Sequence, residues 1–317
     1  MKEIGGYFGL EQLVSNEYHK DLIALNNGRN ALLYVLKAKG VKKILIPYFL
    51  CDAIKDVLSD NNYEYEYYNI NCDFMPIVQK EHFDDNEYIY IVNYYGQFSN
   101  DTVIAMKKRF ENVIFDYAHA FFQKPIEGID TIYTCRKFFG VPDGAYLSTN
   151  IKLEENLDED LSSERITHLI GRYEGKASDY YDCFQKVENT FRSEPLKRMS
   201  RFTKNILGAI DYEKVMEIRN MNFKYFDSKL KKINKLNLKN SSGPYVYPLY
   251  VDNGSEIRKI LQSKKIYIPT LWPNVINDME QNSIEYSYAE NILPLPCDQR
   301  YGQTEIETII RELNNIG

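Results

Sequence analysis

A lysine near the middle of the chain is set in a context where its amine could form an imine. In segment 130–145, DTIYTCRKFFGVPDGA, a strand-like run ends in Thr-x-x-Lys, and a glycine-containing loop leads into another apolar run. A lysine at the end of a sheet strand can be fixed and partly desolvated, as an imine-forming amine must be, which selects Lys137. Thr134 could offer its hydroxyl to a phosphate. The alternative is that Arg136 and Lys137 form an ordinary basic pair on a surface turn.

A carboxylate follows another apolar run. In segment 113–122, VIFDYAHAFF, Asp116 comes directly after three apolar residues, and ligands of open α/β sheets bind beyond the carboxyl ends of the strands. A carboxylate there can keep a pyridinium nitrogen protonated, which maintains the electron sink of pyridoxal phosphate (PLP) chemistry. The alternative is an aspartate that caps the next helix.

Segment 26–33, NNGRNALL, has features of a phosphate site. It places Gly28, Arg29 and Asn30 at the start of a predicted helix. Free backbone N–H groups and the helix dipole favour a phosphate at such a position. Many helices begin in this way, so the segment gains its meaning from the other two.

An open α/β sheet would position these three groups. Short apolar runs alternate with helical patterns in the first half of the chain, which is typical of a parallel sheet covered by helices. Helices are expected at 30–39 and 50–58. Strands are expected at 43–47, 63–67, 88–92, 112–115, 131–134 and 145–148.

The second half of the chain has a different character. It is mostly helical from about residue 153 to 233, followed by a strand at 245–251, a helix at 256–262 and a strand at 266–268. Thr304 and Glu307 predict a capping box for the last helix. The apolar positions of two helices are Val215, Ile218, Phe226, Leu230 and Ile233, then Ile306, Ile309, Ile310 and Leu313. We expect a large α/β domain at 1–205 and a small C-terminal α+β domain at 206–317.

The composition excludes several classes of protein. Apolar residues make up 44% of the chain and charged residues 26%, with a net charge of -6, which gives no basic face for a nucleic acid. Five cysteines without a CxxC pair and four unclustered histidines predict no metal site. No apolar run approaches the length of a membrane span. The odd cysteine count and an N-terminus unlike a signal peptide predict a cytoplasmic protein.

The three segments resemble, in the same order, those of the DegT-type (DegT/DnrJ/StrS) sugar aminotransferases, a family with the type I PLP-enzyme fold. Segment 27–32 is similar to the Ser-Gly-Thr-x-Ala-Leu phosphate loop of that family, and 115–120 to its Glu-Asp-x-Ala-His-Ala segment. Its Lys-x₅-Glu-Gly-Gly segment matches Lys137, Asp143, Gly144 and Ala145 at the same spacing. Weaker similarity includes 46–49 and LPCDQRYG at 295–302.

The resemblance implies a role for each matched residue. Lys137 would form the imine with PLP and shuttle a proton, Asp116 would pair with the pyridine nitrogen, and Ala118 would pack on the ring. Gly28, Arg29, Asn30 and Thr134 lie in or beside the phosphate site, and His119 matches the family histidine. Cys51 stands where an aromatic residue often covers the other ring face, unless Tyr48 or Phe49 reaches in. The chain also departs from the family by having Arg29 in place of Thr and no Gly-Tyr-Asn segment.

The implied activity is transfer of an amino group from an amino acid, such as glutamate, to a keto sugar that can be nucleotide-linked. The resemblance also implies a homodimer. The alternatives are a PLP-dependent sugar dehydratase on the same scaffold and a non-catalytic ligand-binding relative. Some relatives of the dehydratase kind replace the lysine, so Lys137 favours transamination. The carboxylate of the donor requires an arginine, and the candidates are Arg29, Arg136, Arg172 and Arg300.

Overall fold

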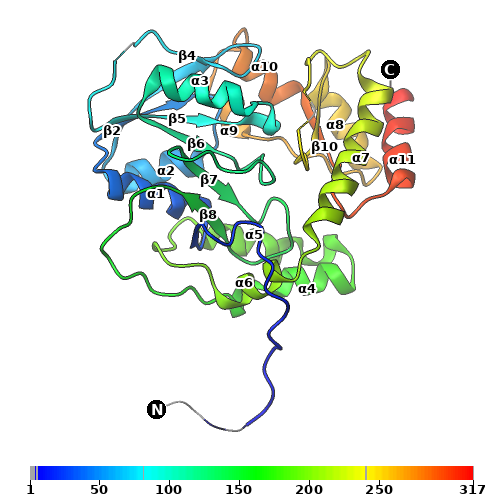
Figure 1. The fold of residues 1–317 in the computed structure, drawn as a ribbon. Coiled ribbons are helices and arrows are strands. Elements are labelled where there is room, and N and C mark those ends of the chain that lie inside the picture. Colours follow the sequence, from blue (N-terminus) through cyan, green and yellow to red (C-terminus); the bar gives the residue numbers. More distant parts are fainter. Residues whose placement is uncertain (1–3, 5, 81, 240, 317) are drawn as a thin grey trace.

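An eight-stranded sheet is the largest element of the fold (Figure 1). The computed structural model describes residues 4, 6–80, 82–239 and 241–316. The strands lie in the order β1-β8-β7-β6-β5-β2-β3-β4. Their bounds are β1 Ile23–Leu25, β2 Lys43–Pro47, β3 Glu64–Ile70, β4 Pro76–Ile77, β5 Glu87–Val92, β6 Val113–Asp116, β7 Asp130–Thr134 and β8 Ala145–Ser148. The six predicted strands are therefore confirmed, while the short strands β1 and β4 were not predicted.

The five central strands of the sheet run parallel. Strands β3, β2, β5, β6 and β7 form parallel pairs, whereas β8, β1 and β4 pair antiparallel with their neighbours. The carboxyl ends of parallel strands meet at one edge of a sheet. Here that edge collects Pro47, Val92, Asp116 and Thr134, so the predicted site residues of β6 and β7 come to adjacent positions.

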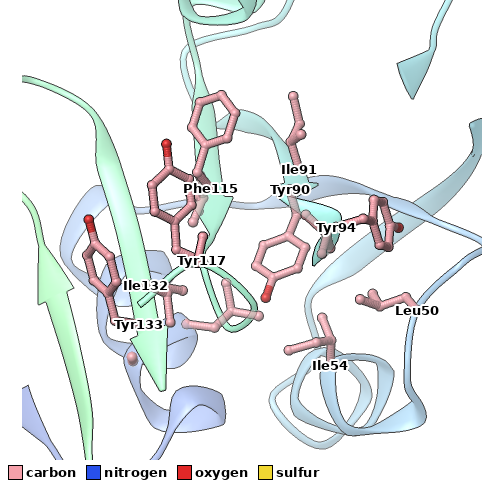
Figure 2. Packing of buried hydrophobic residues seen from close by; sticks show 14 of the residues in the cluster. Leu50, Ile54, Tyr90, Ile91, Tyr94, Phe115, Tyr117, Ile132 and Tyr133 are labelled. Carbon is pink, nitrogen blue, oxygen red and sulfur yellow. The ribbon is translucent and has the colours of Figure 1, made fainter. Parts of the chain in front are cut away.

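Helices cover both faces of this sheet. All six residues of β5 are buried, which requires cover on both sides. In Figure 1, α3 (Asn100–Phe110) lies above the sheet, and α1 (Gly28–Lys39) and α2 (Asp52–Asp60) lie below it. Figure 2 shows Ile91 and Phe115 pointing to one side of the strands, while Tyr90 points to the other side, towards Ile54 of α2.

Short helices and an extended N-terminal arm lie at one end of the sheet. The helices are α4 Thr167–Glu174, α5 Tyr181–Thr190 and α6 Arg201–Gly208, with 3₁₀ turns at Ser163–Arg165 and Ala177–Tyr180; another 3₁₀ turn, Tyr94–Gly96, follows β5. Residues 6–14, which we call the N-terminal arm, extend away from the body of the molecule (Figure 1). Asn205 of α6 holds the root of the arm, because its side chain donates to Glu11 O and accepts from the Leu13 N–H.

A second hydrophobic cluster lies in the C-terminal part of the chain. The elements there are α7 Tyr212–Leu230, β9 Tyr247–Tyr250, α8 Gly254–Ser263, α9 Pro273–Asp278, α10 Ile284–Asn291, β10 Ile292–Leu295 and α11 Gln303–Asn314. Strands β9 and β10 pair antiparallel. Phe226, Leu249, Leu261, Leu293 and Ile310 belong to this cluster, so one residue comes from each of α7, β9, α8, β10 and α11.

Three details of the C-terminal prediction are wrong. Residues 266–268 form no strand, and Ile266 N–H instead donates to Leu261 O at the end of α8. The last helix begins after Gly302, whose N–H donates to the Glu305 carboxylate, so Thr304 and Glu307 form no capping box. Of the predicted buried face of α7, Ile233 is 53% exposed. The apolar stripe of α11 is confirmed as buried.

Among the residues that the structure describes, no helix combines the length and the apolar character needed to cross a membrane.

Candidate active site

Lys137 lies in a turn just beyond β7, at the carboxyl edge of the sheet. Its Nζ is 3.0 Å from Nε2 of His119, a side chain that is only 1% exposed. The tip of Lys137 is thus fixed, as expected. The residue as a whole is exposed, while its contact with His119 is partly buried. The basic pair is not an ordinary one either, because Arg136 turns away and forms an ion pair with Glu188.

His119 has a polar contact at each of its ring nitrogens. Its Nδ1 accepts a 3.3 Å hydrogen bond from the Tyr95 N–H. Burial, together with the nearby charge of Lys137, holds the pKa of His119 well below its usual range, so the ring is neutral. The 3.0 Å contact between Nε2 and Lys137 Nζ therefore holds the amine beside a neutral ring.

Asp116 ends β6 and faces the same space. Its Oδ2 accepts from the Tyr90 hydroxyl at 2.8 Å, and its Oδ1 accepts from the Ala118 N–H at 2.7 Å. Burial raises the pKa of the carboxyl, against the lowering effects of the Lys137 charge and of these two hydrogen bonds. Residues 117–123 form turns and no helix, so the helix-cap interpretation of Asp116 is wrong.

The start of α1 and the end of β7 form a cradle of polar atoms. Asn27 caps α1 by accepting from the Asn30 N–H at 2.8 Å. Three buried atoms around it have no hydrogen-bond partner among the described residues, namely Asn27 Nδ2, Arg29 Nε and Thr134 Oγ1. A Cβ at Gly28 would lie 2.8 Å from Thr134 Cγ2, so this approach requires glycine. Unpartnered donors at a helix N-terminus fit a phosphate.

Asn30 lies beside the cradle but is used differently. Its side-chain amide donates to Asn26 Oδ1 and to the carbonyl oxygens of Glu194 and Pro195. The two bonds to Glu194 and Pro195 tie the first turn of α1 to the segment that leads into α6. The side chain therefore supports the cradle from behind.

The Asp143-Gly144 pair that follows the lysine turn has a structural role. Asp143 is fully buried and accepts hydrogen bonds from the N–H and the hydroxyl of Ser200 and from the Thr203 hydroxyl. It therefore anchors the start of α6 next to the lysine turn. Gly144 has φ +116°, and a Cβ there would lie 3.0 Å from Thr203 Cγ2, so a side chain would be both strained and crowded.

Cys51, the residue before α2, connects the site to a cavity of about 190 Å³. Burial raises the pKa of the thiol. The charges of Lys137 and Arg29 lower it and that of Asp116 raises it, which places all three groups near Cys51. The cavity is lined by Ile46, Tyr48, Leu50, Cys51, Asp52, Lys55, Tyr67, Asn274 and Asp278.

The two aromatic alternatives to Cys51 lie in different surroundings. Tyr48 stacks on Tyr67 with 4.5 Å between ring centroids, and both line the cavity. Phe49 is buried and packs against Trp272 at 4.4 Å instead. Sequence patterns gave no signal for Asn274 or Asp278, because they reach the cavity from a helix more than 200 residues further along the chain.

Of the four candidate arginines, only Arg29 lies at the cradle without an acidic partner among the described residues. Arg136 is paired with Glu188, and Arg300 forms a bidentate ion pair with Asp298 at 2.7 and 2.8 Å. Arg172 is exposed in the last turn of α4.

Comparison with known proteins finds similarity in structure alone. No protein-family model matches the chain, and no curated protein matches it by sequence. Solved structures do match. A DegT DnrJ EryC1 StrS aminotransferase from Brucella abortus is 16% identical with a TM-score of 0.63, over 93% of this chain and 85% of that one.

Two further structures agree with this match. NtdA from Bacillus subtilis, with bound cofactor PMP, is 14% identical with a TM-score of 0.64, over 93% of this chain and 73% of that one. PseC from Helicobacter pylori, an aminotransferase of pseudaminic acid biosynthesis, is 15% identical with a TM-score of 0.60, over 92% and 85%. The chain therefore has the α/β fold seen in these aminotransferases, as its sequence predicted.

Proposed function

We propose that the protein is a PLP-dependent aminotransferase that moves an amino group from an amino acid, such as glutamate, to a keto sugar. One observation carries the proposal. Lys137 Nζ, the Asp116 carboxylate and the cradle at the start of α1 lie around one space at the carboxyl edge of the sheet. An amine, an anion and a phosphate cradle are the three groups that PLP requires of a protein.

The cradle would hold the phosphate of the cofactor. Thr134 Oγ1, Arg29 Nε and the N–H groups that follow Gly28 supply donors, and Asn30 keeps α1 in place. Asp116 would pair with the ring nitrogen, and a protonated nitrogen there would offset the cost of burying the carboxylate. Ala118 would pack on one face of the ring. Cys51 faces this space from the start of α2.

The bound cofactor would supply an electron sink for the α-carbon of the amino acid. Lys137 would hold the cofactor through Nζ and, once released, move the proton between substrate carbon and cofactor. The 3.0 Å contact with His119 Nε2 would hold this amine in place.

The cavity beside Cys51 would take the sugar. Its volume of about 190 Å³ is below the range of about 300–1,000 Å³ that suits larger ligands, so it fits a single ring. Tyr48 and Tyr67 offer apolar faces, and Asp52, Lys55 and Asn274 offer hydrogen-bonding groups. The named activities of the similar proteins, such as PseC, support a sugar acceptor.

The N-terminal arm supports a homodimer. Tyr7 is 98% exposed and Phe8 97%, and each such side chain can bury about 150–250 Å². Two arms and the surfaces that they cover would therefore bury about 1,200–2,000 Å², which is the standard size of a stable interface. We also propose a cytoplasmic location and a division into domains near residue 206. The second hydrophobic cluster, which contains only residues from Phe223 onwards, supports that division.

Absorption spectra of the purified protein test the proposal. With PLP, a visible band should appear, and borohydride should fix the cofactor to Lys137. L-Glutamate should remove the band and yield 2-oxoglutarate. Lys137→Ala should abolish this conversion, whereas Lys124→Ala, at a lysine that lies over the Tyr18 ring, should retain it. A protein that stays colourless with excess PLP would overturn the proposal.

A further inference from the structure

Arg219 of α7 is a buried charge at the boundary between the sheet and the C-terminal elements. It is 1% exposed, and among the described residues it forms no ion pair with a carboxylate. Its guanidinium instead donates to uncharged acceptors, and its pKa is lowered by burial. A buried arginine of this kind is costly compared with an apolar side chain, so its contacts need an explanation other than stability.

The contacts of Arg219 converge on the residue that follows Lys137. Its Nη2 donates to Phe138 O at 3.1 Å, and the guanidinium lies over the Phe138 ring at 4.6 Å. Gln299 completes the arrangement, because its Nε2 donates to the same carbonyl at 2.8 Å and its Oε1 accepts from Arg219 Nε at 2.8 Å. The Phe138 carbonyl is thus held by two donors that are themselves joined. Gln299 belongs to the segment LPCDQRYG, and the sequence suggested no role for this residue.

A second set of contacts reaches Lys137 from the other side. Arg219 Nη1 donates to Pro244 O at 2.9 Å and to Tyr245 O at 3.4 Å. The Tyr245 ring stacks on His119 with 4.7 Å between centroids. His119 Nε2 in turn contacts Lys137 Nζ at 3.0 Å. One guanidinium therefore fixes both the main chain next to the lysine and the ring that supports its hydrogen-bond partner.

We propose that Arg219 and Gln299 are positioning residues for Lys137. They fix the position of the lysine turn relative to Tyr245, so that Lys137 Nζ stays in contact with His119 Nε2 and points into the site. The planar fork of arginine suits this task, since it donates to acceptors in different directions at once. The proposal rests on the function proposed above, because it assigns these two residues to the reaction of Lys137.

We call Arg219 and Gln299, with the Phe138 carbonyl that they hold, the clamp. Three variants test it. Arg219→Met removes the guanidinium, and Gln299→Leu removes one donor to Phe138 O with less risk to folding. Arg258→Met is the matched control, because Arg258 is also buried and also donates to main-chain carbonyls, those of Glu290 and Ile292. Thermal unfolding of all three reports the purely structural effect.

The first readout needs no cofactor. Limited acetylation of the PLP-free protein, followed by mass spectrometry, gives the labelling of Lys137 relative to Lys124 in the same sample. We expect this ratio to change severalfold in Arg219→Met and Gln299→Leu, and to stay at the wild-type value in Arg258→Met. The second readout is kinetic: a misplaced amine should lower kcat by about 100-fold, with KM for the amino donor within about threefold.

The outcomes separate the clamp from the proposed function. If Arg219→Met and Gln299→Leu lower only the unfolding temperature, with the labelling ratio and kcat as in wild type, the two residues are structural and the inference is wrong. If no protein binds PLP, the proposed function fails, while the labelling ratio still reports on the clamp.

Discussion

Replacement of Gly28 by alanine tests the fit between α1 and β7. The new Cβ would lie 2.8 Å from Thr134 Cγ2, well inside normal contact. Overpacking of this kind costs about 1–3 kcal/mol. Gly28 does not have a positive φ, so alanine would otherwise gain up to about 1 kcal/mol by restricting the unfolded chain. We expect the free energy of unfolding to fall by about 1–2 kcal/mol.

The same replacement should weaken cofactor binding. The clash can be relieved by rotation of Thr134 about its Cα–Cβ bond, which also turns Oγ1 out of the cradle. Loss of one hydrogen bond to a charged group costs about 1.5–3 kcal/mol. The dissociation constant of PLP should therefore rise by about 10- to 100-fold.

A Thr134→Ser protein tests whether the contact with Thr134 Cγ2 causes both effects of Gly28→Ala. Serine keeps the hydroxyl and lacks Cγ2, so Gly28→Ala should cost almost nothing in the Thr134→Ser protein. Urea denaturation and PLP titration of the four proteins give a double-mutant cycle, and we expect a coupling free energy of at least about 1 kcal/mol. Gly140→Ala is the control, because no atom lies within 4 Å of a Cβ there. If the two replacements add within about 0.5 kcal/mol, the contact does not shape the cradle.

Three further predictions concern other residues. Asp116→Asn should slow transamination severely and raise the stability of the PLP-free protein at neutral pH. Burial raises the pKa of this carboxyl, so its ionisation costs stability as pH rises through that pKa. Equal activity or a less stable variant would contradict this. His19, whose pKa burial lowers to about 4, should be protonated at a higher pH in the unfolded chain than in the folded protein. Stability should fall by about 3 kcal/mol between pH 6.5 and 4, and His19→Gln should reduce that slope in urea titrations at each pH. Deletion of residues 1–13 should turn a dimer into a monomer in sedimentation at micromolar concentration, and a wild-type monomer would argue against the arm.

The sequence predicted the parts of the site that follow strong local patterns. Asp116 is the last residue of β6 and Lys137 lies three residues beyond β7, so their place at the carboxyl edge followed from the strands themselves. The cradle was predictable from a local pattern as well, because Gly28 is the first residue of helix α1. In contrast, Arg219 gave no signal, since its partners Phe138, Pro244 and Gln299 are distant in sequence.

The wrong elements show where local patterns mislead. Ile266 and Ile268 alternate with Tyr267 as in a strand, but Lys265 has φ +63° and the chain continues the turn that ends α8. No neighbouring strand pairs with these residues in the described chain. Similarly, the spacing of Thr304 and Glu307 matches a capping box, but the helix starts earlier, where Glu305 accepts from Gly302. In each case, a tertiary or terminal contact overrides the short pattern.

The edge of the sheet has a consequence for synthesis on the ribosome. Leu25 of β1 pairs with Ala145 of β8, about 120 residues later. At translation rates of about 5–20 residues per second, β1 stays without its neighbour for about 6–24 s. The cradle forms over a similar separation, because Gly28 packs on Thr134. The nascent chain therefore gains a complete cofactor pocket late, and until then chaperones have an open strand edge to protect.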